Sequence, residues 1–429
     1  MDLFEVFEKP EVKAGVLNVS VKILDVEQLF LSCFPATSIH EKQKLIEMMG
    51  SGKLMCSLCD AIATFGQPID FFGVIVPQLQ IACRDAPTLF QGRSLPLLRS
   101  GVSSVVKLTR RQIRALSSMA FLGLMPPVAP GYGSMDWVSL FFNGHNRTAV
   151  ERLKCQLQYF SAAFQWSDDV LDEVVTFERR CCAGSTPCFN TIASPLFDGE
   201  YRSLVVVDAA SRMEDFTDAT AHVDFANKQL HIGCIIPSCT QEEVMFSVRP
   251  ELFVALPLFE CLKDDEVACV YNTKRLSEYK GYGGTFSFSG PCADDSIQDT
   301  IIIDAIVNRW ESQFSPDGIQ RDLQKAFMGF VGHSVIATGH WGCGIFRGDK
   351  CLKFLQQAIA ARQSKSVLRY STFGNVVDQE LLESVAGALA AARTPVGEIV
   401  RWMGEFEPTD TNRFAEFVME MVEKIPKQQ

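Results

Sequence analysis

The sequence has no excess of positive charge and no long apolar run, and both absences exclude classes of protein. Its 40 Lys and Arg residues stand against 51 Asp and Glu residues, which gives a formal net charge of −11. A surface of that sign does not coat nucleic acid or an anionic membrane, so an anionic ligand has to be bound locally, in a pocket. The most apolar segment, AFLGLMPPVAP, is interrupted by prolines, which argues against a membrane span.

The sequence also lacks a secretory signal and a metal-binding pattern. The N-terminal segment, MDLFEVFEKPEVK, is acidic where a signal peptide is basic, so we expect a soluble intracellular protein. The 15 cysteines are scattered through apolar segments, as free thiols are in reducing compartments. Cys56 and Cys59 have the C-x-x-C spacing, but no second pair completes a tetrahedral zinc site. We expect neither a metal nor a redox cofactor.

Apolar residues recur at helical spacing in the first half of the chain and in strand-like runs in the second half. Helices are expected over 25–49, 54–65, 107–124, 136–142 and 148–163, with Thr109 as an N-cap. The strand-like runs are SLVVVD, AHVDFA, EVACVY, TIIIDAIV, SVIATG and VLRYSTF, and they alternate with amphipathic helices. This alternation predicts a mostly parallel sheet covered by helices. A change of composition over 179–191 predicts a boundary between an all-helical domain (1–190) and an α/β domain (191–429).

Four loops that follow predicted strands carry the unusual residues, and parallel sheets bind ligands at that end of their strands. The first loop runs from Asp224 and Asn227 to Gln241, Glu242 and Glu243, where an apolar helix begins. Adjacent carboxylates raise one another's pKa, and a raised carboxyl pKa suits a general acid near neutral pH. The simpler interpretation is an acidic first helical turn, and the loop taken alone favours it.

The other three loops are rich in glycine and aromatic residues. They are SEYKGYGG around Tyr282, ATGHWGCGIF ending at Phe346, and YSTFGN around Phe373. A glycine-rich turn between a strand and a helix presents backbone N–H groups to phosphate. The turn ATGHWGCG lacks the GxxxxGK[ST] pattern, which excludes a P-loop at this position. A nucleotide-diphosphate pocket with carboxylates directed at ribose would explain the four loops together.

These stretches resemble the catalytic region of poly(ADP-ribose) glycohydrolases, macrodomain-like enzymes that hydrolyse the ribose–ribose bonds of poly(ADP-ribose). The similar segments are, in order, VDFAN, the Gln-Glu-Glu run, RPEL, SEYKGY, ATGHWGCGIFRGD and STFG. A weaker similarity extends upstream through LPLLRSGVSSVVKLTRRQI and CQLQYF, so that the resemblance covers roughly residues 70–395. It implies a macrodomain-like α/β fold, with a mixed, mostly parallel sheet flanked by helices, preceded by an all-helical accessory domain.

The resemblance also implies roles for individual residues. Glu243 matches the catalytic acid/base, which protonates the departing ribose oxygen and then activates water at an oxocarbenium-like centre. Glu242 and Asn227 match residues that position ribose hydroxyls, and Asp224 supports the loop. Glu214 matches the residue that contacts the adenine, and Tyr282 and Phe373 match the aromatics over the adenine and the distal ribose. Along the diphosphate lie the matches Gly342, Gly344 and Phe346. The remaining implied substrate-binding residues are Gln241, Gly233 and His340. The alternative for Glu214 is a solvated surface carboxylate.

The sequence departs from the family pattern at two places. His231-Ile232-Gly233 stands where the family has three glycines, and His340 stands where it usually has asparagine. If the loop keeps its shape, its backbone amides still meet a diphosphate. If Ile232 requires a φ that suits only glycine, the loop shifts and affinity or turnover falls. Because the Gln-Glu-Glu run is intact, we expect an active enzyme.

The expected activity is hydrolysis of poly(ADP-ribose) to ADP-ribose, with no cofactor. One alternative is a module that binds ADP-ribose without cutting the polymer. Another is a hydrolase of mono-ADP-ribosylated proteins or O-acetyl-ADP-ribose, against which the Gln-Glu-Glu run and the Tyr282 loop argue. The expected partners are poly(ADP-ribose) and poly(ADP-ribosyl)ated proteins, with no direct nucleic-acid binding and no membrane. The resemblance implies a nuclear location, compatible with a cytoplasmic pool, because the polymer is made in the response to DNA damage.

Overall fold

The computed structural model describes residues 16–17, 56–67, 69–91, 95–125, 128–141, 143–182, 184, 187–293, 297–307, 313–409 and 413–426. The chain divides into two compact units and passes between them several times. The N-terminal unit comprises residues 1–178, 228–261 and 270–297, and the C-terminal unit comprises 179–227, 262–269 and 298–429. The boundary near residue 190 remains a prediction, since packing groups two later segments with the N-terminal residues.

The N-terminal unit is mainly helical. Its first helices are α3 (Cys56–Ala63), α4 (Val76–Leu89), α5 (Arg110–Phe121), α6 (Val138–Phe141), α7 (Arg147–Ala163) and α8 (Asp168–Asp172), with a π-helical turn η1 (Phe71–Ile75). Thr109 caps α5, as expected, and forms a capping box with Gln112. Aromatic rings fill the core, where Phe121 lies edge-on to Phe141 and Phe160 at centroid distances of 4.9 and 5.1 Å.

Later segments of the chain complete this unit. They are η4 (Leu230–Gly233), α10 (Gln241–Val248), η5 (Pro250–Val254), α11 (Ala255–Leu258) and η6 (Gly283–Thr285), with the antiparallel pair β8 (Ser277–Lys280) and β9 (Ser287–Pro291). A second small pair joins β1 (Val16–Leu17) to β2 (Leu95–Pro96). Helix α10 packs against both α7 and β8, so the Gln-Glu-Glu run lies among the helices of the N-terminal unit.

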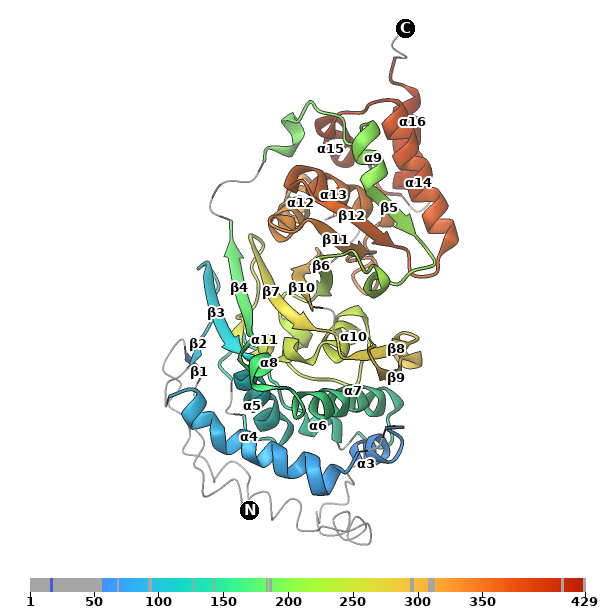
Figure 1. Cartoon of the computed structure of the whole chain (residues 1–429). Coiled ribbons are helices and arrows are strands. Elements are labelled where there is room, and N and C mark those ends of the chain that lie inside the picture. The colour runs from blue at the N-terminus through green and yellow to red at the C-terminus, as the bar shows by residue number, and fades with distance from the viewer. Residues whose placement is uncertain are drawn as a thin grey trace. The chain divides into compact units, whose positions relative to one another are not determined.

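The C-terminal unit is built on parallel strands (Figure 1). Its strands are β5 (Val205–Asp208), β6 (Ala221–Ala226), β10 (Ile297–Asp304), β11 (Val335–Gly339) and β12 (Val367–Ser371), in the order β10-β6-β11-β12-β5 with parallel neighbours throughout. The helices are η2 (Phe189–Thr191), α9 (Gly199–Leu204), η3 (Met213–Asp215), α12 (Pro316–Phe330), α13 (Lys350–Ser364), α14 (Val376–Ala391), α15 (Val396–Glu405) and α16 (Phe414–Glu423). Strands and helices share one apolar core. Helix α13 lies deep in it, since every residue from Cys351 to Ala361 is buried.

All six predicted strand runs form strands in the structure, and the segments between and after the last three of them form helices α12 to α16. Besides β1 and β2, the helical first half supplies strands β3 (Ser104–Thr109) and β4 (Val174–Cys181), which helical spacing did not reveal. Strand β3 is hydrogen-bonded to β4, and β4 to β7 (Glu266–Lys274). The helix expected over 25–49 lies outside the described residues.

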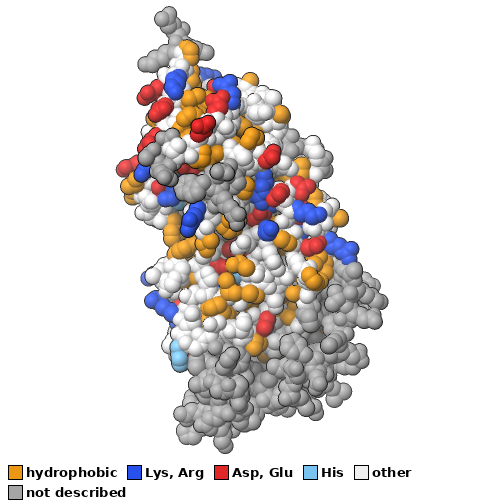
Figure 2. Space-filling view, turned by 180° about the vertical axis from the view of Figure 1, so that it is seen from behind, with side chains coloured by type: hydrophobic (Ala, Val, Ile, Leu, Met, Phe, Trp, Pro, Cys, Tyr) orange, Lys and Arg blue, Asp and Glu red, His pale blue; other side chains and the backbone are white. Residues whose placement is uncertain are grey.

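Acidic and basic side chains are interspersed on the face shown in Figure 2, and no field of one sign is visible there. Among the described helices, none is long and apolar enough to cross a membrane.

Candidate functional site

Glu243 lies in the first turn of α10 and folds back onto the residue that caps this helix. Its Oε2 accepts a hydrogen bond from the backbone N–H of Thr240 at 2.8 Å and another from the Thr240 hydroxyl. This is a capping box, so the simpler interpretation of the acidic pair describes its local conformation correctly. The side chain is nevertheless 3% exposed, whereas an ordinary helix cap lies in solvent. A buried carboxylate with a fixed rotamer is suited to directed chemistry.

Glu242 points to the preceding loop. Its Oε1 accepts a hydrogen bond from the backbone N–H of His231 at 2.8 Å, and its side chain is also 3% exposed. The two neighbouring carboxylates are therefore separated by their contacts, because one binds the cap of its own helix and the other binds the loop. That separation allows both side chains to be buried side by side.

The turn His231–Gly233 adopts the left-handed conformation at every residue. Its φ angles are 52° at His231, 53° at Ile232 and 80° at Gly233. The loop therefore keeps a glycine-like shape although only one glycine remains. A positive φ at a β-branched residue is a true outlier and costs about 1–3 kcal/mol, so the surroundings must hold Ile232 in place.

The two replaced glycines place their side chains very differently. Ile232 is 60% exposed, whereas His231 is fully buried and its ring lies 4.5 Å from that of Phe246 and 5.6 Å from that of Phe253. Burial, with the nearby positive charge of Arg152, lowers the pKa of His231 well below its usual range. Neither ring nitrogen has a hydrogen-bond partner in the described part of the chain. His231 thus acts as a neutral aromatic anchor for the turn.

Tyr282 lies beside the start of α10. The next residue, Gly283, donates its N–H to the Cys239 carbonyl at 2.8 Å, which fixes the Tyr282 loop to the segment that precedes the helix. Burial raises the pKa of the Tyr282 hydroxyl, and the negative charge of Glu243 raises it further. A hydrogen bond with the backbone of Gln241 lowers this pKa and so opposes the rise. The Tyr282 side chain remains 42% exposed. The structure therefore brings Tyr282 together with Gln241 and Glu243.

The C-terminal unit collects a second group of predicted residues at one edge of its sheet. Gly339 pairs with Ser371, and Ser371 pairs with Asp208, so the loops after β11, β12 and β5 start from one row. Asp224, in strand β6, is completely buried and lies level with Ile302. This convergence of loops at the carboxyl ends of parallel strands is the predicted arrangement. Asn227 follows β6, and Glu214 is buried in η3 with 5% exposure.

The glycine-rich loop (Gly339–Asp349) needs its glycines for steric reasons. A Cβ at Gly339 would lie 2.6 Å from the Ser371 carbonyl oxygen, and one at Gly342 would lie 2.4 Å from the Ala305 Cβ. Gly344, by contrast, has open space around it, and Ile345 is 78% exposed. Phe346 packs against the apolar core and so anchors the outer part of the loop.

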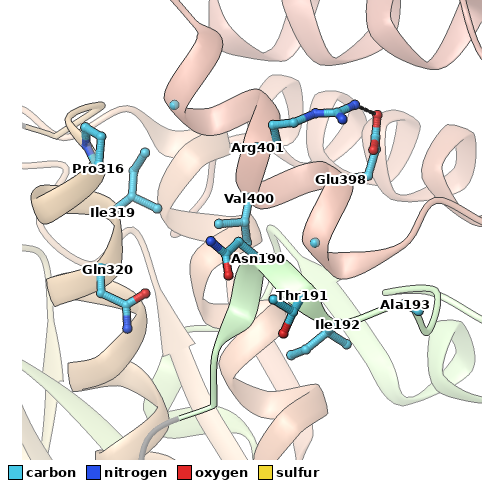
Figure 3. A pocket seen from close by; sticks show the side chains of 12 residues that line it. Asn190, Thr191, Ile192, Ala193, Pro316, Ile319, Gln320, Glu398, Val400 and Arg401 are labelled. Carbon is cyan, nitrogen blue, oxygen red and sulfur yellow. Dashed lines mark hydrogen bonds and ion pairs between the residues drawn. The ribbon is translucent and has the colours of Figure 1, made fainter.

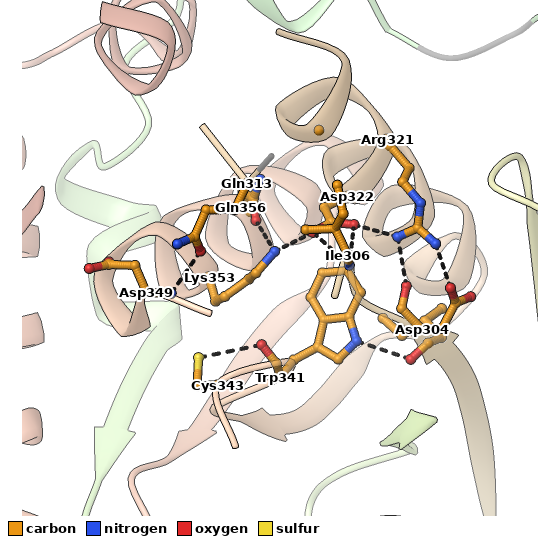
Figure 4. Close-up of polar contacts among 12 residues, drawn as sticks. Asp304, Ile306, Gln313, Arg321, Asp322, Trp341, Cys343, Asp349, Lys353 and Gln356 are labelled. Carbon is orange, nitrogen blue, oxygen red and sulfur yellow. Dashed lines mark hydrogen bonds and ion pairs between the residues drawn. The ribbon is translucent and has the colours of Figure 1, made fainter. Parts of the chain in front are cut away.

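A buried ionic cluster contacts the glycine-rich loop (Figure 4). Asp322 of α12 forms ion pairs with Lys353 of α13 and with Arg321, the latter at 2.7 Å. The Lys353 ammonium lies 5.1 Å from the ring centre of Trp341, whose Nε1 donates to the Ile303 carbonyl at 3.0 Å. This cluster fixes Trp341, and with it the first turn of the loop.

His340 is held by protein groups on both ring nitrogens. Nδ1 lies 3.1 Å from the Tyr370 hydroxyl, and Nε2 lies 3.1 Å from Oδ2 of Asp378. Burial and the neighbouring Lys350 lower the pKa of His340 to about 4, while Asp378 opposes that shift. The imidazole is therefore neutral near pH 7. It links the glycine-rich loop to β12 and α14.

Phe373 forms an exposed corner after β12. It has a φ of 51°, is 49% exposed and receives support from Ser371, whose Oγ accepts its backbone N–H at 3.1 Å. A half-exposed aromatic ring at the end of a strand suits stacking on a ligand.

The structure thus forms two groups of predicted site residues. The first group, in the N-terminal unit, comprises Gly233, Gln241, Glu242, Glu243 and Tyr282, and the second, in the C-terminal unit, comprises Glu214, Asp224, Asn227, His340, Gly342, Gly344, Phe346 and Phe373. From the sequence, no supporting role was expected for Arg152, Thr240, Lys353, Tyr370 and Asp378. Thr240 had a sequence signal, the capping-box spacing Thr-x-x-Glu, and Tyr370 lies in the candidate loop YSTFGN, whereas the other three had none.

A cavity of about 540 Å³ lies elsewhere in the C-terminal unit, between η2, α12 and α15 (Figure 3). None of the predicted site residues lines it, and its charged side chains, Glu398 and Arg401, pair with one another. Among the described residues, no cluster of His, Cys, Asp and Glu could hold a metal ion.

Two family models match the chain. One, the poly(ADP-ribose) glycohydrolase macro domain fold, matches residues 198–380, and the other, the poly(ADP-ribose) glycohydrolase helical domain, matches residues 66–179. A probable poly(ADP-ribose) glycohydrolase 2 of Arabidopsis thaliana is 24% identical over 423 residues, with 80% of each chain covered. Poly(ADP-ribose) glycohydrolase 1 of Caenorhabditis elegans is 33% identical over 253 residues, which cover 52% of this chain and 31% of that protein. The chain therefore spans most of the plant relative and about a third of the nematode one.

Proposed function

We propose that this chain, which belongs to the poly(ADP-ribose) glycohydrolase family, hydrolyses the ribose–ribose O-glycosidic bonds of poly(ADP-ribose) and releases ADP-ribose. The observation that carries the proposal is the buried pair Glu242 and Glu243. Each carboxylate is held in one orientation, and the turn that Glu242 binds keeps its left-handed shape despite the His231-Ile232 replacement.

Glu243 is the proposed acid/base. Its Oε2 is occupied by Thr240, so Oε1 is the oxygen available to the substrate. Protonated Oε1 gives its proton to the departing ribose oxygen as the glycosidic bond breaks and an oxocarbenium-like sugar forms. Water then attacks the anomeric carbon and returns a proton to Oε1, which restores the acid. The capping box keeps the carboxylate in one rotamer through both steps.

Glu242 has a proposed role in substrate orientation. Its Oε1 is held by the His231 amide, which fixes the carboxylate beside the turn, where it can orient a ribose hydroxyl. The same side chain would then hold the left-handed turn and align the ribose. Such alignment supplies catalysis by fixing the reacting atoms relative to one another.

The second group has proposed roles in binding. The backbone amides of the glycine-rich loop suit a diphosphate, because glycines permit close approach of the phosphate oxygens. Phe373, with its exposed ring, suits stacking on the adenine or the distal ribose, and Tyr282 of the first group is the other proposed stacking residue. Glu214 and Asn227 are the proposed contacts to the adenine and to ribose hydroxyls.

The test is incubation of the purified protein with labelled poly(ADP-ribose), following chain length and free ADP-ribose. Glu243→Gln retains an oxygen that can accept from Thr240 but cannot act as an acid, so it should abolish cleavage and retain ADP-ribose binding. Glu416→Gln, a change at an exposed glutamate of α16, is the matched control and should cut like the wild type.

Three outcomes would contradict the proposal in different ways. Cleavage by Glu243→Gln at the wild-type rate would show that another group is the acid. Polymer that stays intact but bound would favour a binding module. Release of single ADP-ribose units from protein without shortening of polymer would favour a mono-ADP-ribosyl hydrolase.

A further inference from the structure

We propose that Arg152 of helix α7 is a positioning residue that holds the loop before α10 and thereby orients Glu242 and Glu243. The inference rests on the proposed function of these two carboxylates. Arg152 lies outside the segments that carry the family motifs of the second half of the chain, and it belongs to the helical N-terminal region.

The guanidinium group binds two backbone carbonyls of the loop. Nη1 donates to the carbonyl of Ile236 and, at 3.4 Å, to that of Ser238. These carbonyls lie between the left-handed turn and Thr240, the residue that caps α10. A single side chain therefore holds the middle of the segment that joins the turn to the helix of the two carboxylates.

A second contact connects Arg152 to the helix itself. Nε donates to the Ser247 hydroxyl at 3.0 Å, and this hydroxyl donates to the carbonyl oxygen of Glu243 at 2.6 Å. The chain of hydrogen bonds runs from α7 through Ser247 to the backbone of Glu243. Helix α7 is a firm base for it, because Asn146 caps the helix and most of its residues are buried.

The position of the positive charge indicates a role beyond packing. Arg152 is completely buried, its hydrogen bonds go to neutral oxygens, and Nη2 has no partner among the described residues. If Arg152 only stabilised the fold, its buried guanidinium would be expected to form a direct ion pair with a carboxylate. Burial lowers the pKa of Arg152, and the charges of Glu243 and Glu242 are among the influences that oppose this.

The strained turn explains why the loop needs such a restraint. His231 and Ile232 are held at positive φ, a conformation that non-glycine residues leave unless their surroundings prevent it. Without Arg152, the carbonyls of Ile236 and Ser238 lose their donor and the loop is free to relax. The hydrogen bond from His231 to Glu242 would then be lost, since its donor lies within the turn.

The experiment compares Arg152→Met, Arg152→Lys and the control Arg114→Met with the wild type. Arg114 is a partly buried arginine of the same unit that also donates from Nη1 to a carbonyl, that of Ala163 at 3.0 Å. It has one unpartnered guanidinium nitrogen, Nε, and lies 5.5 Å from a phenylalanine ring centre. Poly(ADP-ribose) hydrolysis gives kcat and KM, and hydrogen exchange reports the protection of amides over residues 231–243.

Arg152→Met should lower kcat by about 100-fold with KM changed less than roughly threefold, because misplaced catalytic groups act on turnover. Amides over 231–243 should exchange faster while the remaining helices stay protected. Arg152→Lys should give intermediate kcat, and it replaces the Met variant if that variant does not fold. Arg114→Met should retain wild-type kcat and loop protection.

A folded Arg152→Met protein with wild-type kcat or with unchanged protection over 231–243 would overturn the proposal. Equal losses of kcat in the Arg152 and Arg114 variants would do so too, since they would indicate a general stability effect. If the wild type does not cleave polymer, the proposed function fails, and the exchange measurement still decides whether Arg152 holds the loop.

Discussion

Glu242 accepts a hydrogen bond from the backbone N–H of His231 at 2.8 Å, eleven positions earlier in the chain. The contact joins one member of the carboxylate pair to the turn in which two of the family's glycines are replaced. It shows how the loop keeps its shape with larger residues, because a buried acceptor fixes the first amide of the turn.

This contact predicts different stabilities for two substitutions of Glu242. Glu242→Gln retains a side-chain oxygen, so the free energy of unfolding should fall by less than about 1 kcal/mol. Glu242→Ala leaves the buried His231 N–H without its acceptor, and the loss should be about 1–3 kcal/mol. Urea denaturation of both variants measures the difference. Equal stabilities would mean that the hydrogen bond does not hold the turn.

The strain at Ile232 predicts that glycine is more stable there than the native residue. Ile232→Gly should raise the free energy of unfolding by roughly 1 kcal/mol, since relief of strain exceeds the added entropy of the unfolded chain. The side chain is 60% exposed, so little burial is lost. Ile345→Gly is the control, because Ile345 is 78% exposed and has no positive φ. It should lower the melting temperature, and a fall in both variants would contradict the argument.

The environment of His340 predicts a loss of stability in acid. Because burial lowers its pKa from 6.5 to about 4, the unfolded chain takes up a proton at higher pH than the folded one. The resulting stability is fully present above about pH 6.5 and is lost as the pH falls towards 4, by about 3 kcal/mol at most. His340→Asn cannot titrate, so its unfolding free energy should change less between pH 7.5 and 4.5. Identical pH dependence in both proteins would show that His340 is not the titrating group.

The ionic cluster predicts strong coupling between Lys353 and Asp322. Lys353→Met leaves the fully buried Asp322 with less compensation and should cost about 3–5 kcal/mol of stability. Adding Asp322→Asn should recover part of that loss, because the uncompensated charge is removed. A double-mutant cycle by urea denaturation measures the coupling. Additive losses would indicate that the pair does not act as a unit.

Much of the molecule follows from short-range signals in the sequence. The capping residue Thr109 and the six strand runs were predictable because caps and β-branched runs act on residues close to them in the chain. The convergence of loops was predictable too, since parallel strands bring their carboxyl ends to one edge. Strand β3 escaped prediction, because it runs directly into helix α5 and its last residues were assigned to the predicted helix over 107–124.

By itself, the sequence determined the six strand runs of the second half, the identity of the acidic pair and the glycine-rich loops. The tertiary structure alone decided that His231 and Ile232 adopt positive φ and that His340 is held neutral. It also decided that Arg152 binds the Ile236 carbonyl from 84 positions away. The physical reason is that caps and periodicity depend on neighbours in the chain. Strained backbone, shifted pKa values and buried charges depend on groups that only folding brings together.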